Sequence, residues 1–295
     1  MKINGVFIED TFAEVFDIKI SRVLITAYDY EWALASAREA TGFATSIIMC
    51  PAEAGIDRLA KQSETPDSRV GVFIMICHPD ESKLEKQLLA RIGQCVLPAP
   101  TTAVFNGLSN AKKHFRIGYK IKFFGDGFEE EVEVNGRRCW KIPTMEGDFI
   151  IEDSIGYTDG IAGGNIIIMA ETQASALMAA KAAVDAISNV DGVITPFPIV
   201  ASGSKIGSNR YKFLKASTNE RFCPSLIDRV DSELPPDVRG VYEIVINGIC
   251  LDVVREAMRV AILSAVKIPG VVKITSANFE GKLGKHRIWL NELFG

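Results

Sequence analysis

The chain has 295 residues, 47% of them hydrophobic and 24% charged, so it is a globular protein long enough for two lobes. Its net charge of −4 at pH 7 excludes a basic nucleic-acid-binding surface, and no apolar run reaches the ~20 residues that span a bilayer. The N-terminal stretch MKINGVFIEDTFAEVF lacks the apolar core of a signal peptide, so we expect a cytoplasmic protein without a membrane partner.

One pattern recurs four times along the chain: an apolar strand, a short polar turn, an amphipathic helix and a second apolar strand. In the second repeat, for example, Leu84, Leu88 and Ile92 form one continuous apolar stripe along the helix. The strands are expected at residues 22–27, 46–50, 72–78, 94–98, 165–171, 192–196, 241–247 and 270–275. The helices are expected at 29–42, 81–92, 174–188 and 252–266. A parallel second strand would make each repeat a right-handed βαβ unit.

Four such units could build one parallel doubly wound sheet or two split-βαβ sandwiches of the ferredoxin-like kind. The stretch that joins the first two units shows no helix that could serve as a crossover to a parallel neighbour. Residues 118–153 are rich in predicted strand, and Asn135-Gly136 is a strong signal for a two-residue hairpin turn. We therefore predict an α+β fold of two ferredoxin-like lobes with antiparallel sheets, residues 1–145 and 146–295, and a β-hairpin insertion near their junction.

Glu243 interrupts an otherwise apolar strand, VYEIVING (241–248). Strand alternation places Tyr242, Ile244 and Ile246 toward the helices and Glu243 on the other face of the sheet. If that face is open to water, the glutamate is an ordinary surface residue. If another lobe or subunit covers it, the carboxylate must be paired or its pKa must rise, and Glu243 becomes a candidate catalytic group.

Other polar motifs carry weaker signals. The stretch GIAGGN (160–165) precedes a strand and lacks the lysine of a phosphate-binding loop, so a tight turn is expected. GSKIGS (203–208) is interpreted as a polar loop near a cleft. Glu53 and Asp57 follow the strand expected at 46–50, where sites in α/β units tend to gather, although a capped turn is an equally good explanation.

The sequence has few residues that could form a metal site or a nucleophilic catalytic group. The cysteines form no C-x-x-C pair, and only His78, His114 and His286 could add imidazole ligands, so no zinc site is expected. None of the histidines lies in a recognisable nucleophile signature. Buried, reduced thiols are the simplest interpretation of the cysteines, which are Cys50, Cys77, Cys95, Cys139, Cys223 and Cys250.

Several motifs in order along the chain resemble those of the formylmethanofuran:tetrahydromethanopterin formyltransferase family. They are MCPAEAGID, FFGDG, MEGDFIIED, GIAGGN, VYEIVING, PGVVKIT and GKLGKH, and the resemblance extends over nearly the whole chain. It implies a cytoplasmic enzyme of one-carbon metabolism and methanogenesis, which moves a formyl group from methanofuran to N5 of tetrahydromethanopterin or its sarcinapterin variant. It also implies no metal or prosthetic group, and a homo-oligomer, usually a tetramer, with clefts at subunit contacts.

The chain departs from the family pattern at three places. A Gly-Gly pair usual between PFP and IVAS is absent, so Pro198 is followed directly by Ile199. Ala44 and Glu280 each stand where the family usually has glycine. These departures concern the conformation of loops, and the loop around Ser202 to Lys205 above all.

The resemblance places the key carboxylate on Glu243, and our hypothesis is that it acts as the acid/base group of direct formyl transfer in a ternary complex. Orientation of the substrates and hydrogen-bond donors to the oxyanion supply the rest of the catalysis. Substrate-binding roles are expected for Glu53, Asp57, Ser202, Ser204, Lys205 and Asn247. The alternative is a paralogue that binds the carriers without catalysis, which formyl-transfer assays would distinguish.

Overall fold

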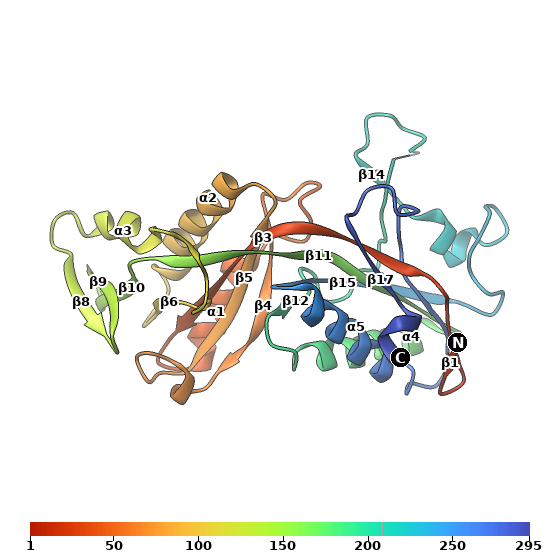
Figure 1. The fold of residues 1–295 in the computed structure, drawn as a ribbon, viewed down its shortest axis with the longest axis horizontal. Helices are drawn as coiled ribbons and strands as arrows, with labels where there is room; N and C mark the ends of the chain where they lie inside the picture. The colour runs from red at the N-terminus through yellow and green to blue at the C-terminus, as the bar shows by residue number, and fades with distance from the viewer. Residues whose placement is uncertain (208) are drawn as a thin grey trace. The chain divides into compact units, whose positions relative to one another are not determined.

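The structure is a computed structural model that describes residues 1–207 and 209–295 (Figure 1). The chain forms two compact units. We call Ile18–Gly160 the N-terminal lobe, and Met1–Asp17 with Ile161–Gly295 the C-terminal lobe. Two long strands, β3 (Phe12–Thr26) and β11 (Ile155–Ala170), contribute residues to both lobes.

The N-terminal lobe has the split-βαβ arrangement predicted from the sequence. Its strands β3, β4 (Glu53–Ala60), β5 (Gly71–His78) and β6 (Ala103–Asn106) pair antiparallel in the order β6-β3-β5-β4. Helices α1 (Tyr30–Thr41) and α2 (Glu81–Arg91) supply Ala33, Ala37, Leu84 and Leu88 to the core on one face. As expected, α1 begins after Asp29, whose side chain accepts a hydrogen bond from the Trp32 N–H at 3.0 Å.

Two predicted strands of this lobe are wrong. Residues 46–50 form a turn, and the strand begins only at Glu53. Residues 94–98 do not form a strand either, because α2 continues into a π-helical segment (Ile92–Val96) whose Ile92 and Val96 are fully buried in the core. Short apolar runs fit a buried helix as well as a strand, so periodicity could not separate the two.

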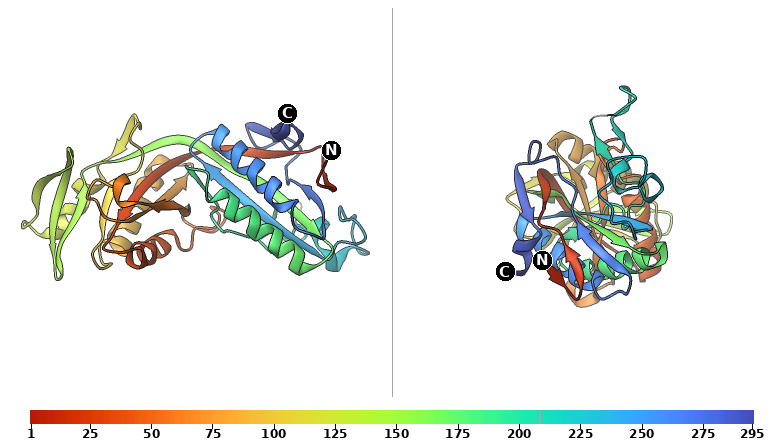
Figure 2. Two further views of the ribbon diagram at one scale, coloured as in Figure 1. Left: turned by 90° about the horizontal axis from the view of Figure 1, so that it is seen from below. Right: turned by 90° about the vertical axis from the view of Figure 1, so that its right-hand side faces the viewer.

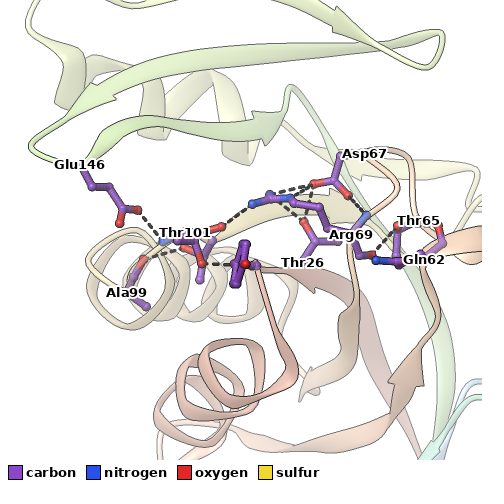
Figure 3. A network of polar contacts seen from close by, with 10 residues as sticks. Thr26, Gln62, Thr65, Asp67, Arg69, Ala99, Thr101 and Glu146 are labelled. Atoms are coloured by element: carbon purple, nitrogen blue, oxygen red, sulfur yellow. Dashed lines mark hydrogen bonds and ion pairs between the residues drawn. The ribbon is translucent and has the colours of Figure 1, made fainter.

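A polar network holds the turn before β6 (Figure 3). Thr101 has φ 61°, a left-handed conformation that a β-branched residue rarely adopts. Its carbonyl accepts from the guanidinium of Arg69, its N–H donates to Glu146, and its hydroxyl accepts from the Tyr28 N–H at 3.1 Å. Asp67 orients Arg69 through a 2.8 Å hydrogen bond, so several side chains together keep Thr101 in this conformation.

The predicted hairpin insertion is present. Strands β8 (Glu130–Val134) and β9 (Arg137–Thr144) pair across Asn135 and Gly136, both with positive φ (47° and 76°), as a type I′ turn requires. The next strand, β10 (Gly147–Glu152), pairs with both β9 and β6. The short elements β7 (Lys113–Phe115) and α3 (Ile117–Ile121) precede the hairpin.

The C-terminal lobe repeats the same topology. Strands β11, β12 (Val193–Ile194), β15 (Gly240–Gly248) and β16 (Val271–Thr275) pair antiparallel in the order β12-β15-β11-β16. Helices α4 (Gln173–Ile187) and α5 (Leu251–Ala265) lie side by side on one face of this sheet (Figure 2). The two ferredoxin-like lobes expected from the four repeats are therefore confirmed.

The N-terminal segment completes the C-terminal lobe. Strand β2 (Val6–Ile8) pairs with β1 (Lys2–Ile3) and with β16, and β17 (His286–Trp289) pairs with the first residues of β3. The compact units thus differ from a division into residues 1–145 and 146–295, because Met1–Asp17 belong to the C-terminal lobe and residues 146–160 belong to the N-terminal lobe. No helix in the described part of the chain is long and apolar enough to cross a membrane.

Candidate active site

Glu243 lies in the middle of β15 and faces away from the helices, as alternation predicts. Its neighbours Ile244 and Ile246 are fully buried among residues of α4 and α5. On one side Glu243 pairs with Val200 through two backbone hydrogen bonds of 2.7 and 2.9 Å. On the other side it is opposite Ile167 of β11, so the carboxylate is flanked by apolar residues on both neighbouring strands.

A segment of the same lobe covers this face of the sheet. Ile167 and Met169 of β11 pack with Leu234 and Val238 in a small second core. The sequence left open whether this face is exposed to water or covered by another lobe or subunit; the chain after β12 covers part of it. Glu243 is half-buried and lines a partly open cavity rather than a bare sheet face, because the covering segment borders that cavity.

The Glu243 cavity has a volume of about 170 Å³. Its walls are mostly apolar and come from Ile167, Val200, Phe222, Pro224 and Val241. Ser202 and Ser225 add hydroxyls, and Asn219 adds an amide. Burial raises the pKa of Glu243 to about 7, and none of the residues described in the structure donates a hydrogen bond to its carboxylate. At neutral pH the group can therefore both accept and release a proton.

Because the pKa is raised, Glu243 is expected to make the folded state less stable as pH rises. Below pH 4.5 the Glu243 carboxyl is protonated in both the folded and the unfolded protein. Between pH 4.5 and 7 the unfolded protein releases this proton first, so the free energy of unfolding falls by up to about 3 kcal/mol. Urea unfolding of the wild type and Glu243→Gln at pH 5 and pH 8 measures this. Between pH 5 and pH 8 the free energy of unfolding of the wild type should fall by about 1–3 kcal/mol more than that of Glu243→Gln. If the free energy of unfolding changed equally with pH in the wild type and the variant, burial would leave the pKa of this carboxyl unchanged.

Two larger cavities lie in the same lobe, of which one adjoins the Glu243 cavity. The first, which we call the loop cavity, has a volume of about 690 Å³ and shares Asn219 and Phe222 with it. The second has a volume of about 700 Å³ and shares Lys205, Glu220 and Arg221 with the loop cavity. The small ribbon of β13 (Lys205–Ile206) and β14 (Ala216–Ser217) belongs to the segment that borders all three.

The structure brings three of the predicted substrate-binding residues to these cavities. Ser202 lines the Glu243 cavity, and Ser204 and Lys205 line the loop cavity. The Lys205 ammonium forms an ion pair with Glu220. Ser208, the last residue of the GSKIGS motif, lies outside the described residues.

Asn247 is on the same strand face as Glu243 but lines none of the three cavities. It is fully buried, and its side-chain oxygen accepts a hydrogen bond from the Gly163 N–H at 3.1 Å. This contact lies beside an irregularity in the pairing of β11, between Ile161 and Gly164. The contact that the structure gives Asn247 is therefore one that holds the backbone.

Glu53 and Asp57 belong to the other lobe and lie within β4, not after a strand end. Glu53 accepts a hydrogen bond from the Ile47 N–H at 3.2 Å and so supports the turn before its strand. Asp57 is buried in an ion pair with Arg22, with both guanidinium contacts at 2.6 Å. Arg22 also lies over the ring of Phe73, 4.1 Å from its centroid, so Asp57 is part of a packed structural cluster.

Sequence reasoning missed the residues that enclose Glu243. Phe222 and Pro224 come from a stretch that composition presents as a polar loop, although the apolar residues of RFCPS hinted at a buried segment. Ile167 could have been found by pairing the third and fourth repeats, because it is directly opposite Glu243. Within the described ranges, no group of three or more His, Cys, Asp or Glu side chains is arranged to hold a metal ion.

Two models of one protein family match nearly the whole chain. The family model described as formylmethanofuran-tetrahydromethanopterin formyltransferase matches residues 1–144, and that of the proximal lobe of the same family matches residues 147–293. A protein of Archaeoglobus fulgidus with the name formylmethanofuran–tetrahydromethanopterin formyltransferase is 69% identical over 297 residues, with 100% of both chains covered.

Two solved structures agree with these matches. The formyltransferase of Methanosarcina barkeri superimposes with a TM-score of 0.98 at 60% identity, with 100% of both chains covered. A chain of the formyltransferase/hydrolase complex of Methylorubrum extorquens, solved with methylofuran, has a TM-score of 0.95 at 41% identity, covering 100% of this chain and 99% of that one. Family models over both halves, a 69% identical relative and the shared fold together show that the chain belongs to the formylmethanofuran–tetrahydromethanopterin formyltransferase family.

Proposed function

We propose that this protein transfers a formyl group from formylmethanofuran to N5 of tetrahydromethanopterin, or of its sarcinapterin variant, within a ternary complex. The single observation that carries the proposal is the setting of Glu243. In a chain of this family, a carboxyl with a pKa of about 7 lies among apolar walls at the centre of the C-terminal lobe. Such a group suits a reaction that moves protons at neutral pH.

The chemistry needs one carbon–nitrogen bond to form and another to break. N5 of the pterin attacks the formyl carbon, and the resulting tetrahedral intermediate expels the amine of methanofuran. N5 loses a proton and the departing amine gains one, so no net proton is consumed. Glu243 is assigned the transfer of this proton, a role that typically contributes about 10²–10⁴-fold to the rate. Amide and product are chemically similar, so the reaction needs no activating co-substrate.

Binding is assigned to the residues around the cavities. Ser202 is next to the proposed reaction centre, while Ser204 and Lys205 offer a hydroxyl and a cation to the anionic parts of a carrier. Glu53, Asp57 and Asn247 have weaker support, because they line none of the three cavities and their side chains hold a backbone N–H or a buried guanidinium. We further propose, as the family resemblance implies, a cytoplasmic homotetramer that works without a metal or prosthetic group.

The direct test is to mix the purified protein with formylmethanofuran and tetrahydromethanopterin and to follow the absorbance of the formylated pterin. We expect formyl transfer that is proportional to enzyme concentration and needs no added metal or nucleotide. The same assay after treatment with a chelator serves as the control for adventitious metal. Binding of both carriers without transfer would contradict the proposal and favour a non-catalytic binding protein.

A further inference from the structure

The loop between β16 and β17, residues 276–285, is built around one buried carboxylate. Glu14 of β3 is only 2% exposed and accepts hydrogen bonds from four backbone N–H groups of this loop. Phe279 and Gly281 donate to one carboxylate oxygen at 2.7 and 2.9 Å. Leu283 donates to the other oxygen at 2.5 Å, and Gly284 donates to the same oxygen. A charge-assisted bond to a backbone N–H is about twice as strong as a neutral one, so Glu14 dominates the shape of the loop.

The ionised form of Glu14 is the form that this arrangement requires. Burial by itself favours the neutral acid, but the four backbone donors outweigh it and hold the pKa of Glu14 below its ordinary value. The fit is also close, because a Cβ added at Gly284 would come within 2.5 Å of Cγ of Glu14. The loop therefore depends on an ionised acceptor and on a glycine that lets its backbone approach.

Two asparagines fasten the start of the same loop. The side-chain oxygen of Asn165 accepts from the Ser276 hydroxyl at 2.9 Å and from the Ala277 N–H at 2.7 Å. Asn278 donates to Thr11 and to the Phe12 carbonyl, each at 3.2 Å. These contacts fix the first residues of the loop against β11 and β3.

The ordered loop is a wall of the loop cavity. Its residues Ser276 to Glu280 line that cavity together with Lys205 and Phe222. The strand before the loop ends at Thr275, which is opposite Ile167, and Ile167 is opposite Glu243. Because neighbouring strands are 4.7–4.9 Å apart, the loop begins about 10 Å from the proposed catalytic residue.

We propose that Glu14 is a positioning residue, which presets loop 276–285 as the wall that binds one of the two one-carbon carriers in the loop cavity. This inference rests on the proposed function for the identity of the ligand. Glu14 does not touch the reacting atoms, since its carboxylate is surrounded by the loop backbone. Its effect is therefore on the binding of a carrier and not on proton transfer by Glu243.

The main experiment compares Glu14→Gln with the wild type in steady-state kinetics, varying each carrier separately. Glutamine has the same shape, but it offers one acceptor oxygen and turns an NH₂ group toward the loop donors. We expect the KM for one carrier to rise at least about tenfold, with kcat within about threefold, as for a loss of binding shared by ground and transition states. The pH dependence of kcat should stay as in the wild type, because Glu243 is unchanged.

A second measurement does not depend on activity. Hydrogen exchange followed by mass spectrometry should show faster exchange of the 279–284 amides in Glu14→Gln, at least about tenfold, while β15 and α5 keep their protection. Gly284→Ala tests the same contact by changing the loop instead of Glu14, because the added Cβ would push the loop backbone away from the Glu14 side chain. It should reproduce both results, and it serves if Glu14→Gln does not fold.

Asp17→Asn is the matched control. Asp17 also lies on β3 and loses one charge, but its oxygens contact the side chains of Lys285 and His286 rather than the loop backbone. It should behave as the wild type. An unchanged KM for both carriers with a loosened loop, a fall in kcat with both KM values intact, or the same defect in Asp17→Asn would each overturn the proposal. A wild-type protein without formyl transfer would reject the proposed function instead, and the exchange data would still report on the loop.

Discussion

Replacing Glu243 with glutamine is expected to lower the turnover of formyl transfer at least about 100-fold while the protein stays folded. Glutamine keeps the size and polarity of the side chain but cannot take up a proton. The cavity around it has mostly apolar walls, and its serine and asparagine side chains do not titrate near neutral pH, so they could not replace the carboxyl as a proton relay. Initial rates at saturating carrier concentrations, with circular dichroism as a check of folding, provide the measurement.

Glu256→Gln is a suitable control for this experiment. It removes one charge from the same lobe, but Glu256 lies on α5 in an exposed pair with Arg259. Its turnover should remain within about twofold of the wild type, since a surface pair of this kind contributes little. Near-normal turnover in Glu243→Gln would remove Glu243 from the mechanism and leave orientation of the carriers as the main source of catalysis.

Replacing Asp57 with asparagine is expected to destabilise the N-terminal lobe by about 3–5 kcal/mol. The Asp57 side chain is 0% exposed and its partner Arg22 only 8%, so the substitution leaves the Arg22 charge buried without this carboxylate. Burial makes the loss far larger than at the surface, because water cannot take the place of the missing partner. Equilibrium unfolding in guanidinium chloride, followed by fluorescence and circular dichroism, measures the change.

The exposed pair of Lys19 and Asp159 in the same lobe provides the comparison. The Asp159 side chain is 69% exposed, so Asp159→Asn should cost less than about 1 kcal/mol. Equal effects of the two substitutions would show that the Arg22–Asp57 pair is not the structural element we describe. A rise in KM with little loss of stability in Asp57→Asn would instead support the substrate-binding role first expected for it.

The repeating pattern of the chain was sufficient to predict the architecture, because local periodicity reflects which face of each element is buried. Alternation in VYEIVING placed Glu243 on the face of the sheet that points away from the helices, and Asn135-Gly136 predicted a turn that the structure contains. The same reasoning failed for residues 46–50 and 94–98. Such runs of about five apolar residues do not record whether a helix or a sheet buries them.

The chemistry of the candidate site was only partly accessible in this way. The type and strand face of Glu243 followed from its neighbours, but its cover did not, since Phe222 and Leu234 reach that face from a segment without regular periodicity. Asp57 shows the opposite case. Its position suggested a site, whereas its burial against Arg22 makes it structural.

The sequence by itself determined the two ferredoxin-like lobes and the face on which Glu243 lies, because both depend on the spacing of residues a few positions apart. Only the tertiary structure decided that a segment of the same lobe partly covers that face, that the pKa of Glu243 is about 7, and that Glu14 holds a loop some 265–270 positions further along the chain. Those properties arise from contacts between distant segments. Burial and hydrogen bonding at such contacts depend on how the chain packs, and no local pattern encodes them.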